Sequence, residues 1–257
     1  MDRIDLNCDL GESFGTWRLG ADDELLASIS SANIACGFHA GDPAVMRRTV
    51  HAALDHGVAL GAHPGFHDLQ GFGRRAVAVS PEEAYELVVY QVGALLGFAL
   101  AAGARLAHVK PHGALYNLAA RDAALADAIA LAVRDLDRSL VLFGLAGSEL
   151  VAAGQRAGLA AAAEAFADRH YLADGALVPR TRPDALVHDP AAAAARVVRM
   201  VHEGQVQSVD GVDVALQPQT ICIHGDGPNA PALARAVRAA LEHAGVQVRP
   251  VDSSGSR

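Results

Sequence analysis

Lysine is almost absent from this sequence. Of its 21 lysine and arginine side chains, only Lys110 is a lysine. The bias toward arginine and alanine runs through the whole chain, which indicates a general compositional pressure that Lys110 resists. A lysine ammonium is compact and can lose its proton when buried, whereas arginine keeps a planar, charged fork. Either a chemical need at this position or chance survival in a loop explains the residue.

Cysteine is also scarce, with Cys8, Cys36 and Cys222 at distant positions. An odd number of cysteines without a CxxC pair fits neither a disulfide framework nor a zinc site of that type. Each cysteine lies in an apolar, strand-like run. We therefore expect three small buried hydrophobic residues rather than nucleophiles.

The chain lacks a basic cluster, since its formal net charge is −8 and its charges of both signs are interspersed. This pattern argues against a nucleic-acid partner, which needs a basic stripe. The first residues are charged where a secretory signal is apolar, and we expect no apolar run to span a bilayer. These features predict a cytoplasmic protein without a membrane partner. No linker or low-complexity tract interrupts the 257 residues, which predicts a single domain over residues 1–257.

Strand-like and helix-like segments alternate along the chain. Seven runs have strand character: residues 4–9, 31–37, 58–63, 106–110, 140–145, 161–166 and 220–224. Helical patterns cover residues 43–56, 81–102, 119–135, 148–157, 190–202 and 229–244, and several open with proline or serine and close with glycine. This alternation is typical of a parallel sheet with right-handed crossovers.

The polar residues of the strands fall on one face. Side chains two positions apart share a face, which groups Asp5 with Asn7 and Asp9, and His108 with Lys110 and His112. A central open sheet is almost continuously apolar, whereas a polar face that grows richer toward the C-terminal strand ends is typical of a barrel that opens into a site. We predict a distorted seven-stranded parallel (β/α) barrel rather than an open sheet.

Glycine-rich loops with ionisable residues follow these strands. Four histidines end strands, namely His39, His63, His112 and His224, whereas the histidines in predicted helices should be solvated: His51, His56, His202 and His243. One histidine at a strand end is usually structural, but four at one end of a barrel indicate a site. Acidic residues join them as potential acids and bases: Asp9, Glu12, Asp42, Asp168 and Asp226. An aspartate with two histidines also suits a divalent metal, although no HExxH or HxH motif is present.

Seven ordered motifs then identify a resemblance over nearly the full length. They are DLNCDLGE at 5–12, ANIACGFHAGD at 32–42, GAHPGF at 61–66, GFGRR at 71–75, VKPHGALYN at 109–117, EAFADR at 164–169 and ICIHGD at 221–226. The chain resembles the bacterial family of 5-oxoprolinase A subunits, also called the LamB/YcsF family. The resemblance implies a barrel of the glycoside hydrolase/deacetylase type. It also implies ATP-dependent hydrolysis of 5-oxo-L-proline (pyroglutamate) to L-glutamate, with release of ADP and phosphate, in an assembly with subunits B and C.

This reaction needs a base for water, an acid for the departing nitrogen, and positive charge beside the developing oxyanion or phosphate. Under the resemblance we expect catalytic roles for Asp9, His39, His63, Lys110, His112 and Asp226. We expect substrate or phosphate binding by Asn7, Glu12, Asp42, Arg74, Arg75, Glu164, Asp168, Arg169 and His224. A metal of the barrel would take Asp9, His39 and His63 as ligands, and Mg²⁺ would accompany ATP.

A phosphate-binding GxxxxGK[ST] loop is missing, because the only lysine lies in a Lys-Pro-His sequence. ATP must therefore bind in another way, on the glycine-rich loops or on a partner. Two other functions remain open, a metal-dependent deacetylase of an acylated sugar and a non-catalytic subunit that binds a small acidic ligand. Residues 180–189 and 204–219 are candidate partner surfaces.

Overall fold

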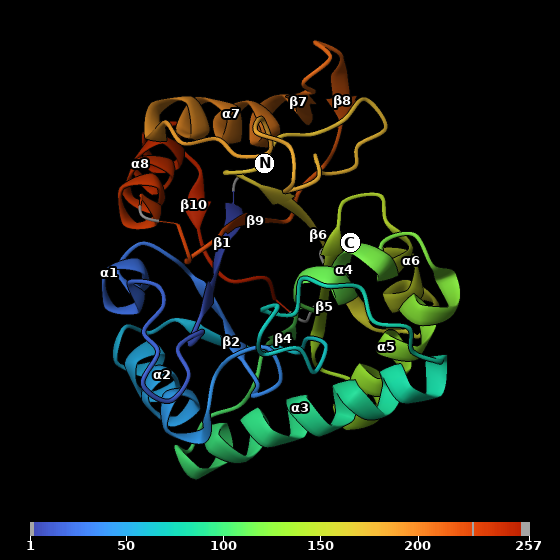
Figure 1. The fold of residues 1–257 in the computed structure, drawn as a ribbon. Helices are drawn as coiled ribbons and strands as arrows, with labels where there is room; N and C mark the ends of the chain where they lie inside the picture. The colour runs from blue at the N-terminus through green and yellow to red at the C-terminus, as the bar shows by residue number, and fades with distance from the viewer. Residues whose placement is uncertain (1–2, 228, 253–257) are drawn as a thin grey trace.

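Seven parallel strands form a closed barrel in the computed structural model, which describes residues 3–227 and 229–252 (Figure 1). The strands run in the order β1 (Arg3–Leu10), β2 (Ser31–Ala35), β3 (Ala59–His63), β4 (His108–Val109), β5 (Val141–Leu145), β6 (Ala160–Phe166) and β9 (Thr220–Ile223). Pairing of β1 with β9 closes the ring. The predicted seven-stranded parallel barrel is confirmed, and its distortion is plain at β4, which has only two residues.

Helices cover the outside of the barrel (Figure 1). They are α1 (Asp22–Leu26), α2 (Pro43–Asp55), α3 (Pro81–Ala101), α4 (Gly113–Ala119), α5 (Ala123–Leu136), α6 (Glu149–Arg156), α7 (Pro190–Glu203) and α8 (Ala230–His243). Proline opens α2, α3 and α7 at the first turn, where its missing N–H costs no hydrogen bond. Ser80 and Glu83 form a reciprocal capping box at the start of α3.

Several short elements were not predicted from the sequence. The helix expected at residues 119–135 is α5, which Asp122 caps, and the separate short helix α4, directly after His112, was not expected. Residues 204–219 contain an antiparallel hairpin of β7 (Gln205–Gln207) and β8 (Asp213–Ala215). The short β10 (Gln247–Val248) pairs in parallel with the N-terminal end of β1. Strands of two or three residues and a helix of seven residues carry too little periodicity to be recognised in a sequence.

Helix α3 contradicts the expectation that no apolar segment could span a bilayer. It has 21 residues and an 18-residue window of mean hydropathy 1.5, which meets the length and composition of a membrane span. In the structure α3 packs against α5 and β3 on the outside of the barrel. Helices that cover the core of a protein meet the same criterion, so α3 by itself does not indicate a membrane protein.

The strands separate an apolar outer layer from a polar interior. Along β1, Ile4, Leu6, Cys8 and Leu10 belong to the apolar core that the helices cover, and the alternate residues turn inward. All three cysteines are buried and unpaired, as predicted. Cys222 differs from the others, because its sulfur faces a charged group inside the barrel. The interior is therefore polar enough to carry a site at its open end.

Candidate active site

A cleft of about 1080 Å³ opens at the C-terminal ends of the strands. The inner wall carries the ionisable side chains of Asp9, His63, Lys110, His112 and His224. The outer wall comes from the loops after β4, β5 and β6 and from β8. These five residues and two arginines, Arg74 and Arg169, were all marked in the sequence as catalytic or binding. The seven thus share one cavity, which lies where barrel enzymes place their chemistry.

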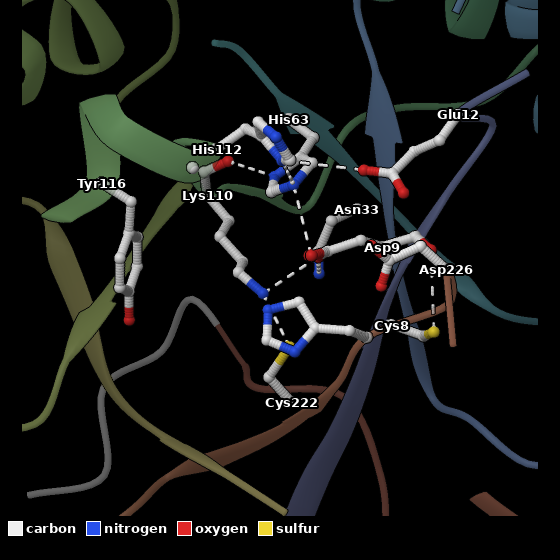
Figure 2. Close-up of polar contacts among 12 residues, drawn as sticks. Cys8, Asp9, Glu12, Asn33, His63, Lys110, His112, Tyr116, Cys222 and Asp226 are labelled. Atoms are coloured by element: carbon white, nitrogen blue, oxygen red, sulfur yellow. Dashed lines mark hydrogen bonds and ion pairs between the residues drawn. The ribbon is translucent and has the colours of Figure 1, made fainter. Parts of the chain in front are cut away.

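Lys110 is buried at the centre of this constellation (Figure 2). Its Nζ lies 3.0 Å from Asp9 Oδ1, 3.0 Å from Glu164 Oε1 and 2.9 Å from Cys222 Sγ. Burial alone would lower the pKa of Lys110, but the neighbouring carboxylates outweigh it and hold this pKa well above its usual value. Of the two properties that distinguish lysine from arginine, the site uses the compact permanent charge rather than the removable proton.

Asp9 is held as a carboxylate by donors on two sides. Its Oδ1 accepts hydrogen bonds from Lys110 Nζ and from Asn33 Nδ2, the latter at 2.9 Å. Its Oδ2 lies 3.4 Å from Nε2 of His63. Burial raises the pKa of Asp9, yet the neighbouring His63 and Lys110 side chains outweigh burial and lower the pKa well below its usual value. Asp9 thus brings a fixed negative charge to the cleft.

Three histidines and Glu12 gather beside Asp9, with a ligand-type atom from each residue within 4.8 Å of the others. His63 Nδ1 lies 2.7 Å from the Lys110 carbonyl oxygen, and His112 Nε2 lies 2.8 Å from the Phe72 carbonyl oxygen. A carbonyl only accepts, so both of these nitrogens carry protons. In neutral rings the other two nitrogens, His63 Nε2 and His112 Nδ1, then face each other as lone pairs at 2.9 Å.

The rest of this cluster also lacks hydrogen-bond partners. Within the described residues, both ring nitrogens of His39 and Oε1 of Glu12 are buried without a hydrogen bond. Burial is the main cause that lowers the pKa of His39 and of His112, so both rings are neutral at pH 7. Burial and the charge of Asp9 raise the pKa of Glu12 well above its usual value, whereas a bound cation would favour its carboxylate form. Neutral imidazoles and a carboxylate oxygen are ligands of zinc-like cations. Glu12, His39, His63 and His112 therefore fit a divalent metal.

This donor set differs from the predicted one. His39 and His63 belong to both, but Glu12 and His112 complete the cluster where the sequence suggested Asp9. The Oδ1 of Asp9 is already engaged by Lys110 and Asn33. The metal and its ligands both stay predictions, to which this geometry adds Glu12 and His112. A second group with donor atoms within 4.8 Å of one another contains Asp9, Cys222 and His224.

Asp168 and His224 form a second ionisable pair on the cleft wall. His224 Nδ1 lies 2.8 Å from Asp168 Oδ2, and the backbone N–H of His224 also points to this carboxylate. Burial raises the pKa of Asp168, but the His224 ring outweighs burial and lowers it below its usual value. An ionised aspartate on Nδ1 leaves Nε2 as the exchangeable nitrogen, which is the arrangement of an oriented general base or acid. The sequence marked both residues as potential acids or bases, but the roles expected under the resemblance placed them in ligand binding.

Other predicted residues support the inner wall or its rim. Asn7 and Glu164 both contact the Lys110 ammonium, and Asn7 Nδ2 donates to Glu164 Oε1 at 2.9 Å. Asp226 forms an ion pair with Arg74 at the cleft rim, where Arg74 is part of the lining. Arg169 also lines the cleft.

Asp42 and Arg75 are placed elsewhere, contrary to the binding role expected of them. The Asp42 side chain accepts from the N–H groups of Ala44 and Val45 as the cap of α2. Arg75 is engaged with Asp68 through two guanidinium nitrogens, and neither residue belongs to the cleft lining. Aspartate before proline at a helix start is a common cap, and this signal was readable in the sequence.

Three contributors to the site were missed. Tyr116 donates to Glu164 Oε2 at 2.6 Å, and Asn33 joins Asn7, Asp9 and His108 in one hydrogen-bonded network. Cys222 shares the inward face of its strand with His224, and this parity was visible in the sequence. The contact of its sulfur with Lys110 required the closed barrel, because the two residues are 112 positions apart.

Comparison with known proteins shows the family of this chain. The LamB/YcsF family profile matches residues 4–256. The A subunit of 5-oxoprolinase from Bordetella pertussis is 61% identical over 246 residues, with 96% of this chain and 98% of that protein covered. The corresponding 5-oxoprolinase A subunit of Bacillus subtilis is 58% identical, with both chains fully covered.

Solved structures show the same relationship. A lactam utilization protein from Thermus thermophilus has a TM-score of 0.92 and 53% identity, over 97% of this chain and all of that chain. The catalytic domain of a peptidoglycan N-acetylglucosamine deacetylase from Eubacterium rectale has a TM-score of 0.51 at 10% identity, over 99% of this chain and 90% of that chain, which shows a shared fold alone. The full-length match of the family profile, with relatives near 60% identity, establishes that this chain belongs to the LamB/YcsF family.

Proposed function

We propose that this chain is the A subunit of an ATP-dependent 5-oxoprolinase, which opens the lactam of 5-oxo-L-proline to L-glutamate. The observation that carries the proposal is the meeting of the Asp168–His224 pair with Lys110 and Asp9 on the wall of one cleft. The relatives, which are named as 5-oxoprolinase A subunits, supply the substrate. The cleft supplies the groups that such a hydrolysis needs.

A lactam amide is a poor electrophile, which explains the coupling to ATP. Transfer of the γ-phosphoryl group to the amide oxygen, with ADP leaving, turns that oxygen into a leaving group and activates the ring carbon. Water then attacks this carbon, the C–N bond breaks, and the ring nitrogen takes up a proton. C–N cleavage leaves the phosphate on the new carboxyl group as an acyl phosphate, and a second water hydrolyses this acyl phosphate to glutamate and phosphate.

The proton transfers fall to His224. Asp168 fixes its ring through Nδ1, so Nε2 can take a proton from water and return it to the departing nitrogen. Lys110 keeps a permanent positive charge at the cleft, which favours the developing negative charge on oxygen. Asp9 holds the ammonium in place, and its own charge disfavours the approach of other anions on that side.

Glu12, His39, His63 and His112 are the residues that would hold a divalent cation. A cation bound there would polarise an oxygen of the substrate or water as a Lewis acid. The histidine-rich donor set favours a zinc-like ion over Mg²⁺, which prefers oxygen ligands. Mg²⁺ is proposed only as the companion of ATP.

We place the chain in an assembly with subunits B and C in the cytoplasm. The experiment is to mix the purified chain with these candidate partners, 5-oxoproline and ATP, and to quantify glutamate and ADP. We expect equal amounts of both products from the full mixture and none at a useful rate from this chain alone. Rapid ATP-coupled turnover by the isolated chain would contradict the need for an assembly.

A metal-dependent deacetylase is the second candidate, because the Glu12 and histidine cluster suits metal-assisted amide hydrolysis as well. It requires neither ATP nor a partner. Acetate release from an N-acetylated sugar by the zinc-loaded isolated chain would favour this alternative, and the lack of acetate together with ATP-coupled glutamate formation would exclude it.

A further inference from the structure

The cleft is larger than the proposed lactam needs. Its volume of about 1080 Å³ extends from Lys110 to the loops after β5 and β6, whereas pockets for drug-sized ligands span roughly 300–1,000 Å³. A five-membered lactam with one carboxylate fills only the part beside the inner wall. The outer part has room for another group, and its lining shows which chemistry it suits.

Ser148 marks the first feature of this outer part. It occupies the cap position of α6, where a serine side chain normally accepts a hydrogen bond from the first turn, but it forms no such bond. Its side chain is 8% exposed and lines the cleft, and its Oγ has no hydrogen-bond partner within the described part of the chain. The helix start thus offers a hydroxyl donor and the positive end of a helix dipole toward the cleft.

Arg169 provides a second buried group without a partner, from the loop after the neighbouring strand β6. Its guanidinium donates through Nη2 to the Val178 carbonyl oxygen at 2.6 Å, while Nε is buried and, among the residues described, unsatisfied. Buried donors normally find an acceptor. The neighbouring Asp168 does not supply one, because its carboxylate is taken by His224.

Arg180 adds a further positive charge on the same wall, where it is half-buried. Burial and the charge of Arg180 lower the pKa of Arg169 to about 10. Two arginines that repel each other and an unpaired hydroxyl thus line the same cleft. A group with several oxygen acceptors and negative charge suits these three side chains.

We propose that Ser148, Arg169 and Arg180 form a subsite for a phosphoryl group, carried either by a nucleotide or by the phosphorylated lactam. The proposal rests on the proposed function for the identity of the carrier, but phosphate binding itself does not depend on turnover. Arg180 lies in the segment 180–189 that the sequence suggested as a partner surface, and this residue is assigned to the cleft instead.

Titration calorimetry of the isolated full chain with inorganic phosphate, ADP and ATP tests the subsite. We expect Ser148→Ala and Arg180→Gln each to weaken phosphate binding by about tenfold, the scale of one charge-assisted hydrogen bond. Arg138→Gln is the matched control, because Arg138 is an exposed arginine that precedes β5 at the opposite end of the barrel. Phosphate binding by this control should equal that of the wild type.

The ligand series identifies the carrier. ATP and ADP that bind tighter than phosphate, with the same dependence on Ser148, assign the subsite to the nucleotide, whereas equal affinities assign it to the phosphorylated lactam. The absence of phosphate binding, or binding unchanged by both substitutions, would overturn the subsite. A lower thermal midpoint of Ser148→Ala with unchanged affinity would reduce Ser148 to a helix cap and also overturn it. A failure of 5-oxoproline turnover would leave these binding results standing and sink only the proposed function.

Discussion

The Nδ1 atom of His112 lies 2.9 Å from Nε2 of His63, although each ring donates its other N–H group to a backbone carbonyl. Two lone pairs at this distance repel, so the pair needs a proton or a metal ion to bridge it. Glu12 Oε1 lies 3.6 Å from the same Nδ1 atom and 3.7 Å from His39 Nε2. Figure 2 shows Glu12 beside this pair. We propose a metal ion as the bridge, because a cation would join the two rings, Glu12 and His39 in one donor set.

The metal proposal predicts that chelator-treated protein takes up one equivalent of Zn²⁺ and gains thermal stability, because the ion binds the folded state alone. His112→Ala removes a ligand and should reduce the bound zinc to background. His51→Ala, an exposed histidine on α2, is the control and should bind zinc normally. Elemental analysis with thermal unfolding checks both variants. Equal zinc content in the two variants would show that His112 is not a zinc ligand. A shared proton would then bridge His63 and His112 instead.

Lys110 predicts a large stability effect. Lys110→Met removes the ammonium that pairs with Asp9 and Glu164 and leaves both carboxylates buried without a cation. This change should cost about 3–5 kcal/mol of unfolding free energy. Lys110→Arg retains the charge but forces a larger fork between Asn7 and Cys222, so it should cost about 1–3 kcal/mol. Urea unfolding at pH 7 compares the two. A Lys110→Met protein as stable as the arginine variant would argue against a charge-dependent role.

Asp5 predicts a pH-dependent stability. Burial, against hydrogen bonds from Ser30, Ser31 and Thr220, raises the pKa of Asp5 from its ordinary value of 3.8 to about 6. A raised pKa in the folded state means that this group contributes stability below its ordinary pKa, which is lost as the pH rises through 6. Asp5→Asn should therefore gain stability relative to the wild type between about pH 4 and about pH 7, by about 2–3 kcal/mol. Denaturant unfolding across this range measures the difference, and a difference independent of pH would refute the assignment.

Asp42 separates a structural role from a catalytic one. Loss of its two helix-capping bonds in Asp42→Ala should lower the unfolding free energy by about 1 kcal/mol. The assembled enzyme should keep its wild-type turnover, because Asp42 does not line the cleft. Reduced turnover with an intact thermal midpoint would return Asp42 to the site.

Periodicity and strand parity were sufficient to predict the barrel. Alternation along β1 separated Asp5, Asn7 and Asp9 from the apolar residues, and this separation holds in the structure. Strand parity also placed Lys110 on the inner face. What parity could not supply was register across strands, because the match of Asp5 to Thr220 that closes the ring joins residues at opposite ends of the sequence.

The detailed site depended on contacts that the sequence cannot order. Asp168 and His224 are 56 positions apart, and nothing local predicts that one orients the other. The choice of Glu12 over Asp9 among the histidines follows from side-chain length and from Lys110, which already occupies Asp9. The sequence suggested that Arg75 binds phosphate. In the structure its guanidinium donates hydrogen bonds to Asp68 instead.

The most direct measurement of the proposed chemistry is glutamate formation by an assembly in which only His224 of this chain is changed. His224→Gln removes the proton-transferring ring, and His243→Gln, at the end of α8, is the matched control. We predict that His224→Gln assembles, keeps a thermal midpoint near that of the wild type, and loses turnover by roughly a hundredfold or more, while the control keeps full turnover. Wild-type glutamate formation by the His224→Gln assembly would contradict the assignment of the reaction to this barrel.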